Sequence, residues 1–141
     1  MKYPIYSDED AGKREADYNE IRLAEIYYSL AECKFKANDV DGAAKLLNAV
    51  RKRNYPQDTW AEYLYKPEGT VTLTQDELYD EWGREFLAEG RRRTDLIRWG
   101  LYCTEEWWDK KPDADSHWDI FPIPRDMMGA DHTLKQNPGY N

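Results

Sequence analysis

The chain has 141 residues, about the length of one average domain. Leu, Ile, Val and Phe account for only 23 of them, and with a net charge of −8 this composition approaches that of disordered proteins. Six Trp and eleven Tyr favour a folded chain, because aromatic side chains bury large areas. The acidic excess excludes nucleic acid as the main partner, since phosphate binding needs a basic surface.

No membrane span, targeting segment or metal centre is predicted. No run of about 18 apolar residues is present, and Met1-Lys2-Tyr3-Pro4 leads directly into polar sequence, so neither a transmembrane helix nor a signal peptide is indicated. Cys33 and Cys103 have no CxxC partner or histidine at zinc spacing, so we expect no metal and no cofactor. The sequence leaves open whether the two cysteines pair.

The sequence predicts a mobile lead-in at the N-terminus, followed by one helical domain. Residues 1–17 contain Pro4 and Gly12 and lack an apolar period, whereas residues 18–141 form the predicted domain. From Tyr18 to Ala37, a 3.6-residue period predicts an amphipathic helix. We expect its apolar side to consist of Leu23, Ile26, Tyr27, Leu30, Ala31 and Ala37.

A second helix is predicted close behind the first. Asn38-Asp39 provides a turn and an N-cap, an apolar period continues to Arg53, and Pro56 ends it. The connection of about three residues places the two helices antiparallel and adjacent. Their spacing fits the 34-residue tetratricopeptide template, in which small Ala31 and Ala43 let the helices approach closely. An ordinary helical hairpin that matches this template by chance is the alternative.

The remaining chain predicts further helices separated by loops. Residues 54–73 read as a long aromatic loop, and Thr74 with Glu77 forms a capping box that begins a third helix. Gly90 weakens its continuation, and a shorter helix is expected to end at Gly100. The prolines beyond residue 111 predict a mostly extended tail. The predicted fold class is therefore all-α, with a tetratricopeptide-like hairpin, further helices, long aromatic loops and an extended Pro-rich C-terminal tail.

The densest charge cluster lies within residues 84–98. Arg91-Arg92-Arg93 alone would suggest an anion site, but Glu89 precedes Arg93 by four residues, which is the favourable order for a helical ion pair. We therefore predict structural ion pairs among Arg84, Glu85, Glu89, Arg91, Arg93, Asp95 and Arg98. No nucleophile or metal ligand accompanies these carboxylates, so no catalytic residue is assigned and the chain is not expected to be an enzyme.

Several motifs, in matching order and spacing, closely resemble the C-terminal part of SusD/RagB-family proteins. They cover roughly residues 20–141, and Asp131-His132 departs from the Asn-Pro that the family commonly has there. The motifs are Arg22-Leu23-Ala24-Glu25-Ile26-Tyr27 with Ala31-Glu32, Leu47-Asn48-x-Val50-Arg51, Arg84-Glu85-Phe86-x-x-Glu89-Gly90-Arg91-x-x-x-Asp95-Leu96-x-Arg98-Trp99-Gly100, and Pro122-Ile123-Pro124 with Gln136-Asn137-Pro138-Gly139-Tyr140.

The resemblance implies a non-catalytic lipoprotein on the outer-membrane surface of Bacteroidetes. Such a protein binds an oligosaccharide or other nutrient and delivers it to a TonB-dependent SusC-like transporter. Family members are mostly helical and several times longer, and they begin with a signal peptide and a lipidated cysteine that this chain does not show. We therefore expect the chain to be a C-terminal fragment or a truncated member.

Two aromatic regions are candidate ligand sites, because sugar rings stack on Trp and Tyr while their hydroxyls bond polar groups. The first combines Trp60, Tyr63 and Tyr65 with Gln57 and Asp58, and the second combines Trp107, Trp108 and Trp118 with Asp109, Asp113 and His117. Loop aromatics that pack back onto their own helices are the alternative for both.

Three further alternatives concern function. Asp113, Asp115 and Asp119 offer oxygen ligands for calcium but lack the glycine and terminal glutamate of an EF-hand. A glycoside hydrolase would need a catalytic carboxylate pair; Glu85 and Glu89 could be paired, but no nucleophile, metal ligand or tuned partner accompanies them. The main rival is a tetratricopeptide-type scaffold that binds a protein partner and has no affinity for sugars.

Overall fold

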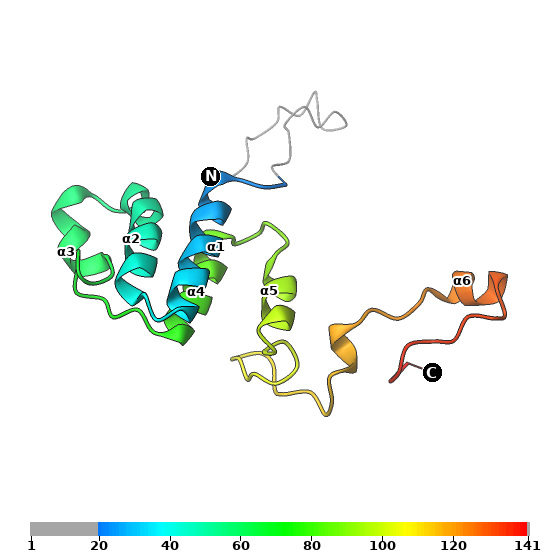
Figure 1. The fold of residues 1–141 in the computed structure, drawn as a ribbon. Coiled ribbons are helices and arrows are strands. Elements are labelled where there is room, and N and C mark those ends of the chain that lie inside the picture. Colours follow the sequence, from blue (N-terminus) through cyan, green and yellow to red (C-terminus); the bar gives the residue numbers. More distant parts are fainter. Residues whose placement is uncertain (1–19, 141) are drawn as a thin grey trace, which may run out of the picture. The chain divides into compact units, whose positions relative to one another are not determined.

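A computed structural model of the protein describes residues 20–140 (Figure 1). The predicted mobile lead-in, residues 1–17, lies outside the described residues. Within the described range the regular elements are helices, accompanied by two isolated bridges and no sheet, which confirms the all-α prediction. The chain divides into two compact units, of which the first ends at Tyr79 and the second begins at Asp80.

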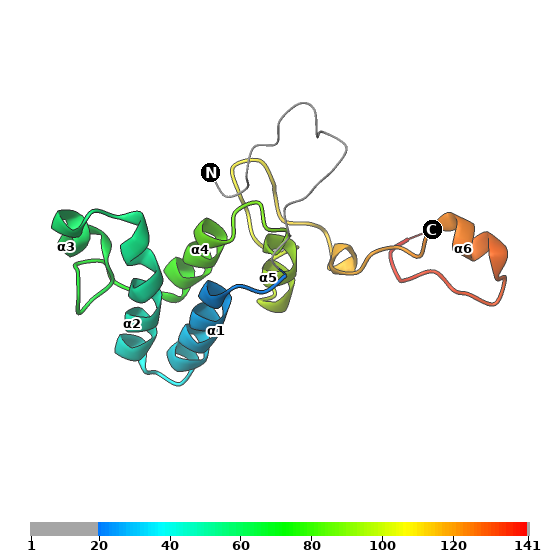
Figure 2. The same ribbon diagram turned by 90° about the horizontal axis from the view of Figure 1, so that it is seen from above.

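The first unit is built on a helical hairpin. Helix α1 (Leu23–Lys36) packs against helix α2 (Val40–Arg51), and Figures 1 and 2 show the short connection between them. Asn38 turns the chain with φ 62°, a left-handed conformation that asparagine tolerates. Asp39 then accepts a hydrogen bond from the Gly42 amide at 2.9 Å and caps α2. The hairpin is confirmed, and its tetratricopeptide assignment stays a prediction.

The buried face of α1 differs from the predicted one. Leu23, Ile26 and Leu30 are 70%, 55% and 48% exposed, so their assignment to the buried side is wrong. The buried residues of this helix are Ala24, Tyr28, Ala31 and Glu32. The reason is that both sets of residues have helical spacing on α1. The set with Ala24 and Ala31 allows the neighbouring backbone to approach more closely, so that face is the buried one.

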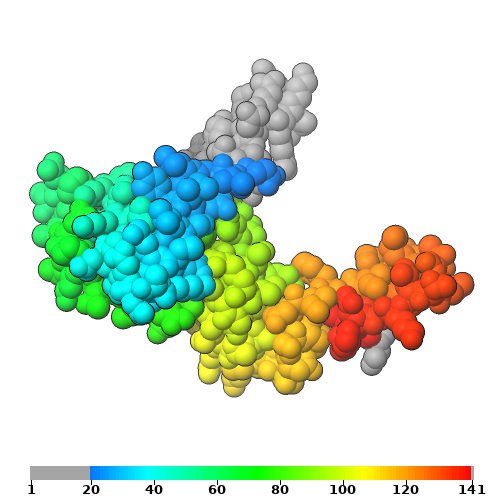
Figure 3. Space-filling view, in the orientation of Figure 1, coloured from blue at the N-terminus to red at the C-terminus, as the bar shows by residue number. Residues whose placement is uncertain are grey.

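Two buried polar side chains of α2 hold the long aromatic loop. The Asn48 carboxamide accepts from the Tyr65 amide and donates to the Tyr65 carbonyl, both at 2.9 Å. Arg51 donates to the Tyr63 carbonyl at 2.7 Å and to the Tyr65 hydroxyl at 3.1 Å. The loop therefore lies directly against α2 (Figure 3). Helix η2 (Lys52–Asn54) leads from α2 into the loop, which contains the short helices η3 (Gln57–Thr59) and α3 (Trp60–Tyr63).

The helix start predicted at Thr74 is confirmed, since Thr74 directly precedes helix α4 (Gln75–Glu85) and accepts a hydrogen bond from its first turn, whereas the return bond from Glu77 stays a prediction. The Glu77 amide donates to the Thr74 hydroxyl at 3.2 Å, while the Glu77 carboxylate accepts from the Tyr65 hydroxyl at 2.8 Å. In the second unit, helix α5 (Arg92–Arg98) follows. It ends at Arg98, and Gly100 directly after the C-cap Trp99 has φ 75°, a left-handed conformation that favours glycine, in agreement with the predicted end of this helix.

The C-terminal tail contains two helical segments that were not predicted. Helix η4 (His117–Asp119) and helix α6 (Arg125–Ala130) interrupt what was expected to be extended chain. Proline ends a helix but can also begin one: Pro124 stands at the N-cap of α6, where its missing amide proton costs no helical hydrogen bond. None of the described helices combines the length and apolar character needed to cross a membrane.

The end of the tail folds back on its own start. The Gln136 carboxamide accepts from the Ile123 amide at 2.7 Å and donates to the Ile123 carbonyl at 2.9 Å. The Tyr140 hydroxyl donates to the Ile120 carbonyl at 2.7 Å. These bonds form a clamp between residues 136–140 and residues 117–123, and they give the C-terminal Gln-Asn-Pro-Gly-Tyr motif a structural purpose.

Candidate functional site

Among residues 20–140, the most exposed of the large hydrophobic side chains lies at the tip of a tight turn in the second unit. Trp107 and Lys110 exchange two main-chain hydrogen bonds, at 2.8 and 3.1 Å, and Trp108 and Asp109 form the tip between them. The Trp108 side chain is 97% exposed. The Lys110 ammonium lies 5.3 Å from the centre of the Trp107 ring and 2.8 Å from the Asp113 carboxylate. The turn is therefore held in shape while the Trp108 indole stays in solvent.

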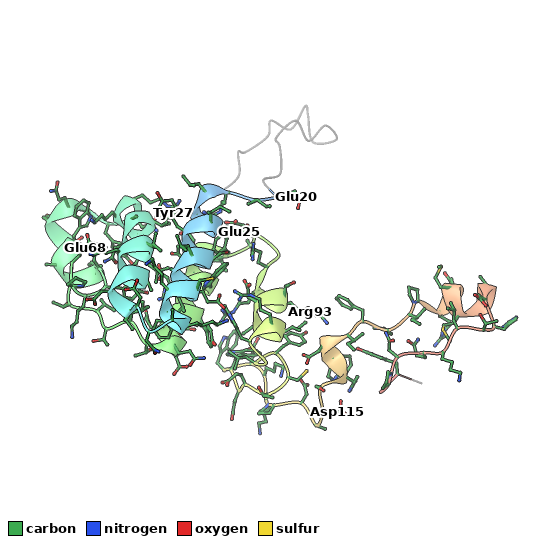
Figure 4. All side chains as sticks on the ribbon, viewed as in Figure 1. Glu20, Glu25, Tyr27, Glu68, Arg93 and Asp115 are labelled. Atoms are coloured by element: carbon green, nitrogen blue, oxygen red, sulfur yellow. The ribbon has the colours of Figure 1, made fainter. Side chains whose placement is uncertain are left out.

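Trp118 belongs to a separate aromatic corner near the chain end. Its ring lies 4.4 Å from the His117 ring and meets the Tyr140 ring edge-on at 5.9 Å, and it remains 49% exposed. Asp115 accepts hydrogen bonds from the His117 main chain and ring, which lower the pKa of the Asp115 carboxyl. Figure 4 labels Asp115 near the start of this segment. Among the described residues, no ring contact joins this corner to Trp107 or Trp108.

The first predicted region is only partly accessible. Tyr65 is fully buried and bonded through its hydroxyl, so its ring cannot stack on a ligand. Trp60 donates its indole N–H to the Tyr55 carbonyl at 3.0 Å and lies half-buried under Lys52. Tyr63 stacks on Tyr55 at 4.7 Å and is 38% exposed.

Neighbouring charged groups shift the pKa values of two side chains in the first predicted region. The neighbouring Glu62 carboxylate raises the pKa of the Tyr63 hydroxyl. The Lys52 ammonium lowers the pKa of the Glu68 carboxyl, which Figure 4 labels beside the hairpin. Because most of these rings contact protein groups, the region resembles a packed loop more than an open platform.

The charged cluster of the second unit is centred on Asp95. This buried carboxylate lies 2.8 Å from Arg98 and 3.7 Å from Arg91, while Arg84 pairs with the buried Glu81 at 2.9 Å. Guanidinium groups also stack on rings: those of Arg91 and Arg98 lie 5.2 and 5.0 Å from the Trp82 ring. Glu85 is buried and Glu89 is half-buried in the same segment.

Arg93 has partners other than the predicted Glu89. It donates to the main-chain carbonyls of Trp118 and Asp119, at 2.6 and 3.3 Å, and its guanidinium lies 3.9 Å from the Phe121 ring. It points from α5 toward this segment (Figure 4). Arg93 thus holds the tail through carbonyl and ring contacts, which spacing along one helix could not indicate.

An open hollow of about 680 Å³ lies beside these arginines. Arg84, Arg92 and Arg93 line it, together with Phe86 and Leu87. Arg84 pairs with Glu81, Arg92 lies 3.8 Å from Asp80, and Arg93 is bonded as described above. Because each guanidinium at the hollow has a protein partner, the geometry favours a structural network over an anion site.

The possible metal ligands do not converge. Asp113 pairs with Lys110, Asp115 with His117, and the Asp119 carboxylate lies 3.3 Å from the Cys103 sulfur. Over residues 20–140, no three His, Cys, Asp or Glu side chains come together as a metal site. Both cysteines are free, and burial raises the pKa of the Cys103 thiol.

Sequence reasoning missed two aromatic partners. Tyr55 stacks on Tyr63, and Tyr140 meets both His117 and Trp118. For Tyr55, its position directly before Pro56 at the start of the aromatic loop was an available signal. For Tyr140 the available signal was its place in the Gln136-Asn137-Pro138-Gly139-Tyr140 motif, but nothing in the sequence connected it with Trp118, 22 positions earlier.

Over the described residues the chain is helical, its arginine cluster contacts carboxylates, carbonyls and rings of the protein, and Trp108 is exposed on a closed turn. Comparison with known families gives the particular assignment: the chain matches the SusD family over residues 2–140 and belongs to that family. This confirms the resemblance seen in its motifs.

Two curated relatives support the family assignment. The starch-binding protein SusD of Bacteroides thetaiotaomicron is 37% identical over 138 residues, which cover 89% of this chain and 22% of that protein. The SusD-like protein P25 of Formosa agariphila is 36% identical over 81 residues, which cover 57% of this chain and 15% of that protein. The chain thus spans about a fifth or less of these relatives. The name of the Bacteroides protein describes binding and not catalysis, in agreement with the expectation that the chain is not an enzyme.

Proposed function

We propose that the protein binds carbohydrate through aromatic stacking and hydroxyl hydrogen bonds, without catalysis. Membership of the SusD family and the name of the starch-binding relative support this class of ligand. The observation that carries the proposal in this chain is Trp108, which is 97% exposed on a turn closed by two main-chain hydrogen bonds. An exposed indole on a fixed support offers a flat apolar face to the C–H face of a sugar ring.

The energetic contribution of Trp108 can be worked from area. A sugar ring that covers about 80 Å² of the indole gains about 2 kcal/mol at ~25 cal/mol per Å², or roughly thirtyfold in affinity. The turn adds preorganisation, because its hydrogen bonds already hold the main chain on which the ring is mounted. Trp118, half exposed between His117 and Tyr140, is the second proposed contact.

Calorimetric titration with maltoheptaose tests this proposal, because the Bacteroides relative is named for starch. We expect Trp108→Ala to weaken binding roughly thirtyfold and to leave the helical circular dichroism unchanged, since the side chain contacts little protein. Met127→Ala is the matched control, a large side chain of the second unit that is 58% exposed outside the aromatic regions. Equal affinity of the two variants, or no binding by the unaltered chain across neutral glycans, would contradict the proposal.

Family membership also supports the proposed location and partner. We propose that the protein acts at the outer-membrane surface as a lipoprotein of Bacteroidetes and delivers its ligand to a SusC-like TonB-dependent transporter. A transporter gene directly upstream of this gene would support the partnership. Flanking genes for carbohydrate-degrading enzymes would narrow the glycan.

The rival function, a tetratricopeptide-type scaffold, is favoured by one observation. Leu23, Ile26 and Leu30 form an exposed apolar stripe on α1 at the spacing that a partner's amphipathic helix recognises. On this hypothesis Leu30→Glu abolishes binding of a helical partner, and maltoheptaose has no effect on the protein. Sugar binding that Leu30→Glu leaves unchanged would favour the carbohydrate function.

A further inference from the structure

A second hollow lies within the first unit, and none of its lining residues belongs to the two aromatic regions. Its volume is about 210 Å³, and it is lined by residues from the C-terminal part of α1 and from the first two turns of α4. Ligand pockets for drug-sized molecules usually measure about 300–1,000 Å³. The size of this hollow therefore suits one small ring and excludes a folded peptide.

Each helix presents a pair of polar side chains to the hollow. On α1, the Lys36 ammonium lies 2.8 Å from the Glu32 carboxylate, whose side chain is 7% exposed. On α4, the Gln75 carboxamide donates to the Tyr79 hydroxyl one helical turn away. Both pairs have the i, i+4 spacing that aligns side chains on one helix face. Four hydrogen-bonding groups are thus held in position before a ligand arrives.

The lining also has an apolar part. Phe35 and Leu78 contribute to the wall, and Leu78 is 1% exposed. Asn38, whose backbone makes the left-handed turn after α1, adds a carboxamide to the lining. The hollow therefore combines an apolar patch with donors and acceptors on several sides.

The charges in the lining select the class of ligand. An anion would meet the Glu32 carboxylate and a cation would meet the Lys36 ammonium, since both groups line the same small space. A purely apolar ligand would remove polar groups from water without replacing their hydrogen bonds, which is unfavourable. A neutral ligand with an apolar face and several hydroxyls satisfies all three conditions.

From this lining we infer that the hollow between α1 and α4 binds one neutral pyranose ring of a glycan. This inference rests on the proposed carbohydrate function and adds a subsite that does not involve Trp108 or Trp118. The carboxylate and amide oxygens accept from sugar hydroxyls, the ammonium and amide nitrogens donate to them, and Phe35 and Leu78 face the ring carbons.

Proton–nitrogen NMR spectra of the full chain provide a direct test, with glucose, galactose, mannose and xylose as probes. We expect the side-chain amide signals of Gln75 and Asn38 to shift saturably with at least one of these sugars. Gln75→Ala and Tyr79→Phe each remove a hydrogen-bonding group from the hollow and should weaken that sugar about fivefold to tenfold. Asp76→Ala is the matched control, because Asp76 lies on the same turn of α4, is exposed and does not line the hollow.

The outcomes separate this subsite from the general function. One outcome is that Trp108→Ala weakens maltoheptaose binding while the Gln75 and Asn38 signals do not shift and Gln75→Ala has no effect. This outcome would overturn the subsite and leave the proposed function intact. No response to any sugar at any signal would overturn both. Saturable shifts at Gln75 and Asn38 with weaker binding in Gln75→Ala, but not in Asp76→Ala, would support the subsite.

Discussion

Replacing Asn48 by alanine tests the two hydrogen bonds with which this side chain holds the aromatic loop on α2. The side chain is fully buried, accepts from the Tyr65 amide and donates to the Tyr65 carbonyl. The two hydrogen bonds of Asn48 do not contribute equally to stability. The Tyr65 carbonyl also accepts from the main-chain amides of Glu68 and Gly69, each at 3.1 Å, so it keeps partners in Asn48→Ala.

The Tyr65 amide determines the cost of the substitution. Tyr65 is buried, so an amide that loses its acceptor is left without water, at a cost of about 1–3 kcal/mol. The space left by the missing carboxamide adds about 1 kcal/mol. We therefore expect Asn48→Ala to lower the free energy of opening around Tyr65 by about 3 kcal/mol, which is roughly a hundredfold in the opening equilibrium.

Hydrogen exchange of the Tyr65 amide measures this equilibrium directly. The Tyr65 amide should exchange roughly a hundredfold faster in Asn48→Ala than in the unaltered chain. Asn54→Ala makes the same chemical change at an exposed asparagine of η2 and should leave the rate within a factor of about two. Equal exchange rates in the two variants would refute the argument that Asn48 satisfies the loop.

Two further predictions concern an ion pair and a glycine. The Lys52 ammonium lowers the pKa of Glu68, so the pair's contribution to stability is complete above the ordinary value of 4.5 and is lost as pH falls through the lowered pKa of the folded state. We expect the urea midpoint of the unaltered chain to fall more on acidification below 4.5 than that of Glu68→Gln, and parallel curves would contradict this. Gly139→Ala should open the tail clamp, because φ is 88° and a Cβ atom would lie 2.4 Å from the His117 Cβ. Tail amides should then exchange faster, whereas Gly129→Ala, with open space around it in α6, should stabilise that helix by about 0.5–1 kcal/mol; equal exchange in the two variants would count against the clamp.

Local signals predicted the helix ends better than the helix faces. Asp39 caps α2, Thr74 caps α4, and Gly100 ends α5, as their residue types indicated. These features depend on hydrogen bonds within three or four residues, which sequence spacing contains in full. The α1 stripe failed because Ile26 and Tyr28 lie on different faces of one helix, and only the position of α2 decides which face is covered.

In the candidate site, too, the sequence indicated the local features but not the long-range contacts. Composition identified the aromatic regions, but it could not separate Tyr65, which is buried, from Trp108, which is 97% exposed. The difference arises because Asn48 and Arg51 draw the Tyr65 segment onto α2, whereas the Trp107–Lys110 turn bonds only to itself at its tip. Exposure depends on such long-range partners, which residue type does not record.

By itself, the amino-acid sequence determined the all-α class, the caps of α2 and α4, the end of α5 and the family to which the chain belongs, because these follow from short-range spacing and from motif order. The tertiary structure decided which side of α1 is buried, how Gln136 holds Ile123, and where α1 and α4 leave a hollow. Each of these joins residues at least 12 positions apart or from different elements. Several faces of one helix can be apolar enough to be buried, and close packing against a neighbouring element decides which of them is.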